Sequence, residues 1–132
     1  MGGGYPLCVN DIQQGFIAFI GAHDPAGSDG TATLEVEVAE RHLNAAGTVH
    51  GGLLATLVDA TMGEAVRSAV GDEVPATSQL SLTYLRPGRC GRLVVTASVR
   101  KRGEQLTVCE ADVEQDGKSL VHALATFALL ES

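Results

Sequence analysis

The residues of this chain that are best suited to chemistry lie in one stretch, positions 44 to 70. A Gly-rich turn holds His50, Gly51 and Gly52, and the apolar segment that follows has Asp59 as its first acidic residue. The start of a helix exposes unpaired backbone N–H groups and partial positive charge. Because Gly51 and Gly52 have no side chain, their backbone can approach a carbonyl oxygen or an anion closely. The pattern therefore predicts an electrophilic site at this turn.

In the predicted helix, Asp59 lies on the side that carries small and apolar residues and not on the polar side. On an ideal helix, Glu64 and Ser68 project about 140° to 180° away from Asp59. The residues that share its side are small or apolar: Gly52, Thr56, Met62, Gly63 and Val66. We therefore expect Asp59 to face apolar surroundings, and we expect Glu64 to be a solvated helix residue.

The elements that must position these residues can be read from hydrophobic periodicity. The long helix ends at Gly71, the usual position for a left-handed cap, and Thr31–Val38 alternates as a half-buried strand. A short N-terminal helix is expected over 7–20, a loop over 23–30, and strands over 77–85, 92–101, 106–113 and 119–130. The dipeptide Asp116-Gly117 predicts a two-residue hairpin turn between the last two strands. Four consecutive strands joined by short turns predict an antiparallel meander, and the helix can be buried only by lying across it. The helix is apolar on nearly all sides, so we expect a second subunit to cover the remainder.

The bulk composition indicates one domain and excludes several classes of function. The chain has 132 residues, 45% of them hydrophobic, which is enough for one core. We expect residues 1–6 to be disordered and residues 7–132 to form a single domain. A net charge of −7 speaks against nucleic-acid binding. Neither a membrane span nor a signal peptide is recognisable, so a cytoplasmic protein is expected.

The cysteines and histidines show no pattern of a disulfide framework or a metal site. The three cysteines include no CxxC pair, and the four histidines have no paired ligand spacing. The cysteines are expected to be buried small apolar residues, and His122 is expected to pack in the core. No metal is predicted.

Basic residues are concentrated in one sector of this acidic chain. No acidic residue lies between Glu73 and Glu104, whereas six of the nine basic residues do: Arg86, Arg89, Arg92, Arg100, Lys101 and Arg102. Such a sector suits an anionic ligand such as a phosphorylated cofactor, although solvated strand ends would give the same pattern.

The residues and their order together resemble one family. The arrangement of one strand, one long helix and a curled antiparallel sheet is similar to the α+β hotdog fold. His50-Gly51-Gly52 followed by Asp59 resembles the signature of the PaaI-like acyl-CoA thioesterases, and it extends to Asn44 upstream and to Thr77 ahead of Thr83-Tyr84-Leu85-Arg86-Pro87. The resemblance covers about residues 10 to 130.

This resemblance implies an acyl-CoA thioesterase. The Gly51 N–H would point at the thioester oxygen with support from His50, Asp59 would act as general base or as nucleophile, and Asn44 and Thr77 would orient the attacking water. From the residues alone, His50 could equally be a helix cap, Asn44 a turn residue and Thr77 an ordinary strand residue.

The helix geometry adds a constraint on how such a site is assembled. Gly51 and Asp59 are separated by about 12 Å along one helix, so they cannot touch one thioester within a single chain. We therefore expect a homodimer with composite sites, alone or paired as a dimer of dimers.

The substrate is expected to be a medium-chain or aryl acyl-CoA. Coenzyme A would be part of the substrate, no separate cofactor is expected, and Arg86, Arg100 and Arg102 would suit its phosphates. Gly52, Met62 and Gly63 are expected to contact the substrate, with Gly63 leaving room one turn after Asp59. Met62, Val66, Phe16 and Phe19 could line the acyl pocket. The alternatives are a non-catalytic protein that binds acyl thioesters and a hydroxyacyl-thioester dehydratase. The dehydratase is disfavoured because Glu64, not a His, follows Asp59 by five residues.

Overall fold

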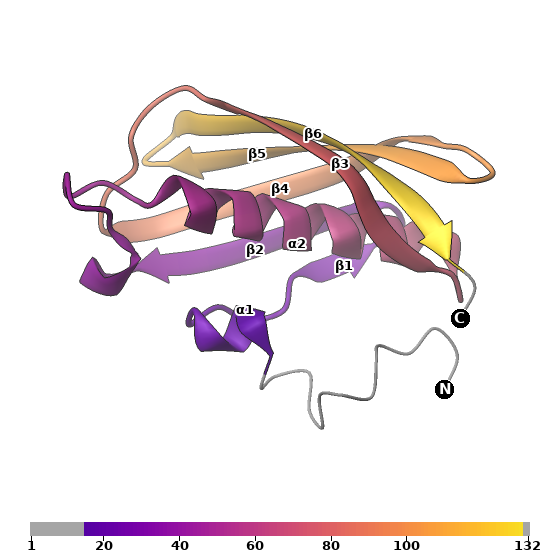
Figure 1. Cartoon of the computed structure of the whole chain (residues 1–132), viewed down its shortest axis with the longest axis horizontal. Coiled ribbons are helices and arrows are strands. Elements are labelled where there is room, and N and C mark those ends of the chain that lie inside the picture. The colour runs from indigo at the N-terminus through magenta and orange to yellow at the C-terminus, as the bar shows by residue number, and fades with distance from the viewer. Residues whose placement is uncertain (1–14, 131–132) are drawn as a thin grey trace.

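The structure, a computed structural model, describes residues 15–130, and the expected disordered segment 1–6 lies outside them. Figure 1 shows one long helix lying across a curled antiparallel sheet, as the hotdog expectation required. The elements in chain order are α1 (Phe16–Phe19), β1 (Ala26–Ser28), β2 (Thr31–Val38), η2 (Glu40–His42), α2 (Gly51–Val70), β3 (Val74–Tyr84), β4 (Gly91–Arg102), β5 (Leu106–Gln115) and β6 (Lys118–Leu130).

Helix α2 is the centre of the hydrophobic core. It ends at Val70 and Gly71 follows as its C-cap; the φ of 76° is positive as predicted, but the ψ of −121° is not that of the left-handed cap. The side chains of Leu57, Val58 and Val66 are fully buried against the inner face of the sheet. The even residues of β2 from Ala32 to Val38 are buried as well, in agreement with the alternation of that strand. The helix is therefore held by burial of one face, and its other face is left to form a surface.

The sheet order is β1-β2-β4-β5-β6-β3, so the predicted four-stranded meander is wrong for β3. Strands β4, β5 and β6 do follow one another as hairpins, but β3 pairs with β6 at the far edge. The loop from β3 to β4, residues 85–90, must therefore cross three strand spacings, about 14 Å. Six residues can span about 20 Å, and Pro87 within them is incompatible with a tight hairpin.

The segment 23–30, predicted to be a loop, contains the short edge strand β1. It forms a hairpin with β2 through Asp29 and Gly30, whose φ values of 51° and 86° are those of a two-residue hairpin turn. Asp116 and Gly117 make the predicted hairpin between β5 and β6 with nearly the same geometry, at 53° and 77°. The same dipeptide, Asp-Gly, therefore forms the hairpin turn at both places.

The N-terminal helix is short in the part that can be described. The prediction covered 7–20, of which 7–14 lie outside the described residues, and α1 comprises only four residues. Phe16 and Phe19 on α1 are exposed, whereas Ile20 just after it packs against the core. In Figure 1, α1 lies below β2, and a short segment joins it to β1. No helix among residues 15–130 is long and apolar enough to cross a membrane.

Truncation of a core side chain on α2 should destabilise the protein strongly. We expect Leu57→Ala to lower the free energy of unfolding by about 2 to 5 kcal/mol, because it removes buried methyl groups and leaves a cavity. Leu106→Ala is the matched control, since Leu106 is 51% exposed. Urea unfolding at equal protein concentrations measures both variants, and equal midpoints would contradict the assignment of the core.

Candidate active site

A cleft of about 790 Å³ lies along the face of α2 that the sheet does not cover. It is bounded by α1, the segment before β1, and the start of β3. Its lining residues are Gly15, Phe16, Ile17, Asp24, Pro25, Thr56, Asp59, Ala60, Gly63, Glu64, Arg67, Pro75, Thr77 and Phe127. Asp59 is therefore at the wall of a cleft with many apolar residues, as the sequence predicted from its helix position.

The carboxylate of Asp59 is held by a hydroxyl from a different element. Thr77 Oγ1 on β3 donates to Asp59 Oδ1 at 2.6 Å. The bond brings together two predicted site residues that are 18 positions apart in the chain. It occupies one carboxylate oxygen and leaves Oδ2 of Asp59 available for a proton or an electrophile.

A β-bulge is the reason that Thr77 points into the cleft. Leu80, Leu82 and Tyr84 share the inner face of β3, so strict alternation would turn the odd-numbered Thr77 outward. The register against β6 shifts between Thr77 and Gln79, and the extra residue is Ser78. Its Oγ lies 2.7 Å from Thr126 Oγ1 and donates to the Thr126 carbonyl at 3.1 Å. The bulge therefore reverses the phase of β3 and aims Thr77 at α2.

Glu64 and Met62 lie elsewhere than predicted. The side chain of Glu64, expected to be solvated, is only 15% exposed and receives two hydrogen bonds from Arg67 at 2.8 and 2.5 Å. A Cβ on Gly27 of β1 would come within 2.7 Å of Glu64 Cγ, so the carboxylate is packed beneath this strand. Met62, an expected acyl contact, is fully buried in the core because it is rotated about 60° from Asp59 toward the sheet.

The Gly51 turn is rigidly held at the start of α2. His50 Nδ1 accepts the Gly52 N–H at 2.9 Å, which makes His50 the N-cap. The His42 carbonyl accepts the His50 N–H at 2.9 Å, and Tyr84 Oη donates to the Gly51 carbonyl at 2.8 Å. Within residues 15–130, the Gly51 N–H has no acceptor. The Gly51 N–H could therefore donate to a further acceptor, whereas that of Gly52 already donates to His50.

Asn44 organises the loop that leads to this turn. Its Oδ1 accepts the N–H groups of Ala46 and Thr48 at 3.0 and 3.1 Å, and its Nδ2 donates to Thr48 Oγ1 at 3.0 Å. These bonds give Asn44 a turn role, and its orientation of a water stays a prediction.

The predicted site residues form two groups within one chain. Asp59, Gly63 and Thr77 meet in the cleft, whereas Asn44, His50 and Gly51 belong to the loop at the start of α2 and do not line it. Gly51 and Asp59 are about 12 Å apart along the helix axis. One chain therefore places the Asp59 carboxylate in the cleft and the unpaired Gly51 N–H outside it.

The basic sector is divided as well. Arg86 lies near the start of α2, whereas Arg100 and Arg102 lie at the end of β4, a strand about 40 Å long. Arg100 pairs with Glu110 at 3.0 Å and Arg102 with Glu73 at 3.9 Å. The arginines expected to bind phosphates are thus not brought together.

Other reactive groups are not part of the cleft. Burial raises the pKa of the Cys109 thiol to about 12, so this cysteine is neutral and cannot act as a nucleophile near neutral pH. His122, predicted to be in the core, instead lies half-exposed on the outer sheet face beside Asp112, at 3.0 Å. No group of three or more His, Cys, Asp or Glu side chains within residues 15–130 could hold a metal ion.

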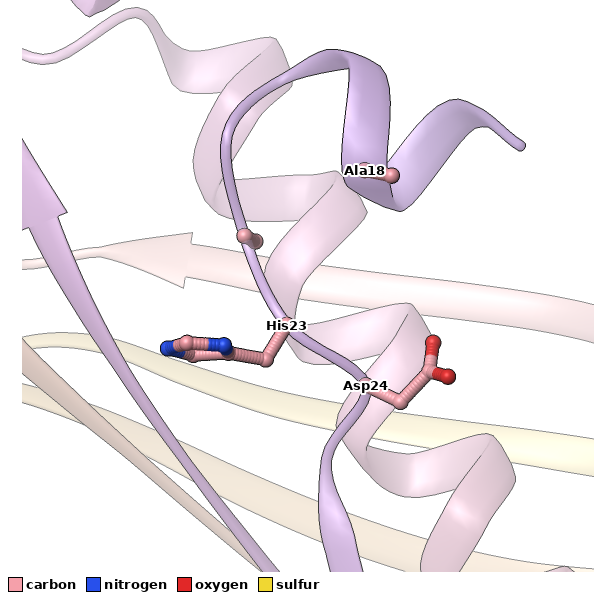
Figure 2. A pocket seen from close by; sticks show the side chains of 4 residues that line it. Ala18, His23 and Asp24 are labelled. Atoms are coloured by element: carbon pink, nitrogen blue, oxygen red, sulfur yellow. The ribbon is translucent and has the colours of Figure 1, made fainter. Parts of the chain in front are cut away.

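A second cavity, of about 380 Å³, lies beside α1. Figure 2 shows His23 and Asp24 on the segment after α1, with their side chains on opposite sides of the backbone. Its remaining lining residues are Ala18 and Ala22. The cavity contains no pair of groups in hydrogen-bond contact comparable to Asp59 and Thr77.

Comparisons with known proteins agree on the kind of chemistry. The thioesterase superfamily matches residues 46–122. A protein of Halobacterium salinarum, named provisionally as an esterase, is 40% identical over 76% of this chain and 70% of its own length. Human acyl-coenzyme A thioesterase 13 is 35% identical over 67% of this chain, and the match spans 64% of the human protein.

Solved structures share the fold along most of the chain. A conserved protein of Pseudomonas aeruginosa is 34% identical with a TM-score of 0.82, covering 86% of this chain and 92% of its own. A hypothetical thioesterase of Streptococcus pneumoniae with coenzyme A is 28% identical with a TM-score of 0.75, covering 80% and 85%. The PaaI protein of the phenylacetic acid degradation operon of E. coli is 27% identical with a TM-score of 0.74, covering 79% and 75%.

Removal of the His50 side chain should weaken the start of α2. We expect His50→Ala to lower the free energy of unfolding by about 1 kcal/mol, because the Gly52 N–H loses its acceptor. His50→Asn should stay close to the wild type, since asparagine caps helices well. Chemical unfolding of the three proteins measures this, and a His50→Ala variant as stable as the wild type would show that the cap contributes nothing.

Proposed function

This chain belongs to the thioesterase superfamily and is a thioester hydrolase, and we propose that it hydrolyses an acyl-CoA to the free acid and coenzyme A. The observation that carries the proposal is the Asp59 carboxylate, held by Thr77 at 2.6 Å in a cleft of acyl-group size. A protein that only bound acyl thioesters would not need a carboxylate beside the carbonyl. Two related proteins support the choice of substrate, one by its name and one by the coenzyme A in its structure.

The proposed reaction uses the Gly51 N–H as the oxyanion donor. It hydrogen-bonds the thioester oxygen and stabilises the negative charge that develops there; such a donor is worth on the order of 3 to 4 kcal/mol of barrier. With Asp59 as general base, Oδ2 takes a proton from water and the water oxygen bonds to the carbonyl carbon. The C–S bond then breaks, and the sulfur of coenzyme A takes the proton.

Asp59 as nucleophile is the second form of the same mechanism. Its oxygen would bond to the carbonyl carbon, the C–S bond would break, and water would hydrolyse the resulting anhydride. Thr77 serves either form, because its hydrogen bond fixes the rotamer of the carboxylate. The acyl group, medium-chain or aryl, would lie along α2 beside Gly63, between Phe16 and Phe127.

The active unit in this proposal is a homodimer with two composite sites. Each site pairs Gly51 of one subunit with Asp59 of its partner, which removes the 12 Å conflict. The free edge of β3 supports an interface between copies, since Leu80 and Leu82 are only partly buried and Tyr84 is 52% exposed. A dimer of dimers and a cytoplasmic location stay predictions.

Loss of the Asp59 charge should abolish most of the activity. We expect Asp59→Asn to lower kcat at least about a hundredfold, as for loss of a principal base or nucleophile. Thiol release from acetyl-, hexanoyl-, palmitoyl-, phenylacetyl- and 4-hydroxybenzoyl-CoA measures this and names the acyl class. Asp112→Asn, on the outer sheet face, is the control. If the wild type binds acyl-CoA but releases no thiol, the enzyme assignment is wrong and the non-catalytic binding protein is the better explanation.

The composite site can be tested because the Gly51 N–H can be removed by proline. Gly51 is the first residue of α2, where proline is well tolerated. His50 before it has φ −61° and ψ 130°, values that a residue preceding proline readily adopts. Gly51→Ala is the matched control: it adds the same Cβ, 3.3 Å from Tyr84 Oη, but keeps the N–H. We expect Gly51→Pro to be inactive and Gly51→Ala to retain activity.

Two inactive variants should then complement each other. In dimers of a Gly51→Pro chain with an Asp59→Asn chain, one of the two sites has both wild-type groups. Coexpression in equal amounts should therefore restore about a quarter of the wild-type activity. Coexpressed chains that form mixed dimers without any activity would show that each site is built within one chain.

A further inference from the structure

The β3–β4 loop, residues 85–90, is fixed to its surroundings along its whole length. The Leu85 N–H donates to the Leu120 carbonyl at 2.7 Å, and the Gly88 carbonyl accepts the Val49 N–H at 2.9 Å. Gly88 is buried so closely that a Cβ there would come within 2.8 Å of Val49 Cγ2. The loop is thus attached to the segment that leads directly into the Gly51 turn.

Gln115 completes the attachment from the end of β5. Its side chain is a two-point clamp on the main chain of Arg89: Oε1 accepts the Arg89 N–H at 2.9 Å, and Nε2 donates to the Arg89 carbonyl at 2.8 Å. Gln115 is only 8% exposed, and both hydrogen bonds are partly buried. The oxygen and the nitrogen of this buried amide both hydrogen-bond the main chain of Arg89. They therefore fix the position of the Arg89 backbone, from which its side chain extends.

The guanidinium groups on this loop, like that of Arg41 on η2, form no ion pair with a carboxylate among residues 15–130, whereas four other arginines do. Arg67, Arg92, Arg100 and Arg102 each pair with a carboxylate. Arg86 uses Nη1 on the neutral Ser119 carbonyl, at 2.8 Å. Arg89 is exposed, and among residues 15–130 its guanidinium has no ion-pair or hydrogen-bond partner. Glu114 and Asp116, near Gln115 in the chain, form no ion pair with either arginine.

We propose that Arg89, with Arg86 on the same loop, forms a binding subsite for the phosphate groups of the thioester's carrier, and that Gln115 is the positioning residue of this subsite. An arginine fork binds phosphate oxygens in a bidentate manner, and it binds best when its backbone is already fixed. Figure 1 shows the loop at the same end of the molecule as the start of α2. The proposal rests on the acyl-thioester substrate proposed above, and it replaces Arg100 and Arg102, whose charges are compensated, by Arg89.

Comparing substrates with and without phosphate distinguishes phosphate binding by Arg89 from a general effect on catalysis. The test compares the best acyl-CoA of the panel with the matching acyl-pantetheine, which has the same thioester and no phosphate. We expect Arg89→Gln to raise KM for the acyl-CoA about tenfold without a change in kcat, and to leave acyl-pantetheine unaffected. Arg92→Gln is the control, because Arg92 is paired with Glu35.

The acyl-4′-phosphopantetheine ester distinguishes the two sources of phosphate. If its KM rises with Arg89→Gln, the subsite holds the phosphate next to pantetheine, which acyl carrier proteins share. If only the acyl-CoA is affected, the subsite holds the nucleotide phosphates. Either result supports a phosphate subsite.

Gln115→Met keeps the volume of the side chain and removes both hydrogen bonds. We expect it to raise KM for the acyl-CoA and not for acyl-pantetheine, as Arg89→Gln does. A purely structural residue would instead lower stability and affect both substrates alike. An unchanged KM for the acyl-CoA in Arg89→Gln, or an equal rise for both substrates, would overturn the proposal.

Calorimetric titration with coenzyme A separates this proposal from the proposed reaction. If the wild type binds coenzyme A about tenfold more tightly than Arg89→Gln but turns over no thioester, the subsite stands and the reaction falls. If thioesters are hydrolysed and coenzyme A binds both proteins equally, the reaction stands and the subsite is disproved.

Discussion

Burial of one face of α2 is the constraint on which the rest of the structure depends. Leu57, Val58, Met62, Ala65 and Val66 have no exposed surface, and together they fix the rotation of the helix against the sheet. Once that rotation is fixed, the position of every other helix residue follows. Asp59 and Gly63 must face outward into the cleft, and the first N–H of the helix must emerge beside the β3–β4 loop. The core therefore gives the site its geometry.

Much of this could be predicted because it depends on local patterns. The long helix, its Gly71 cap, strand β2 and the Asp116-Gly117 hairpin each follow from residues close together in the chain. The side of the helix that bears Asp59 follows from the helical period alone. The signature of His50, Gly51, Gly52 and Asp59 indicated the fold and the chemistry together, because its spacing only has meaning on such a helix.

The features that were missed depend on contacts between distant segments. The order of the strands depends on where the β3–β4 loop crosses, which Pro87 hints at but does not determine. Glu64 is shielded because β1 lies over it, and β1 was not expected to be a strand. The pairing of Arg92, Arg100 and Arg102 with carboxylates depends on cross-strand neighbours and on the end of α2. The sequence gives the positions of these charges in the chain but not the distances between them in the fold.

The bulge at Ser78 has a consequence for how such sites arise and disappear. Successive residues of a strand face opposite sides of the sheet. One inserted residue therefore moves all the residues on one side of the insertion to the opposite face. A lineage that lost this single residue would still carry Asp59 and Thr77, yet the hydroxyl would face solvent on the other side of the sheet. Descendants of that kind would retain Asp59 and Thr77 without the hydrogen bond between them. Gaps in an alignment, more than substitutions, would then separate active members from inactive ones.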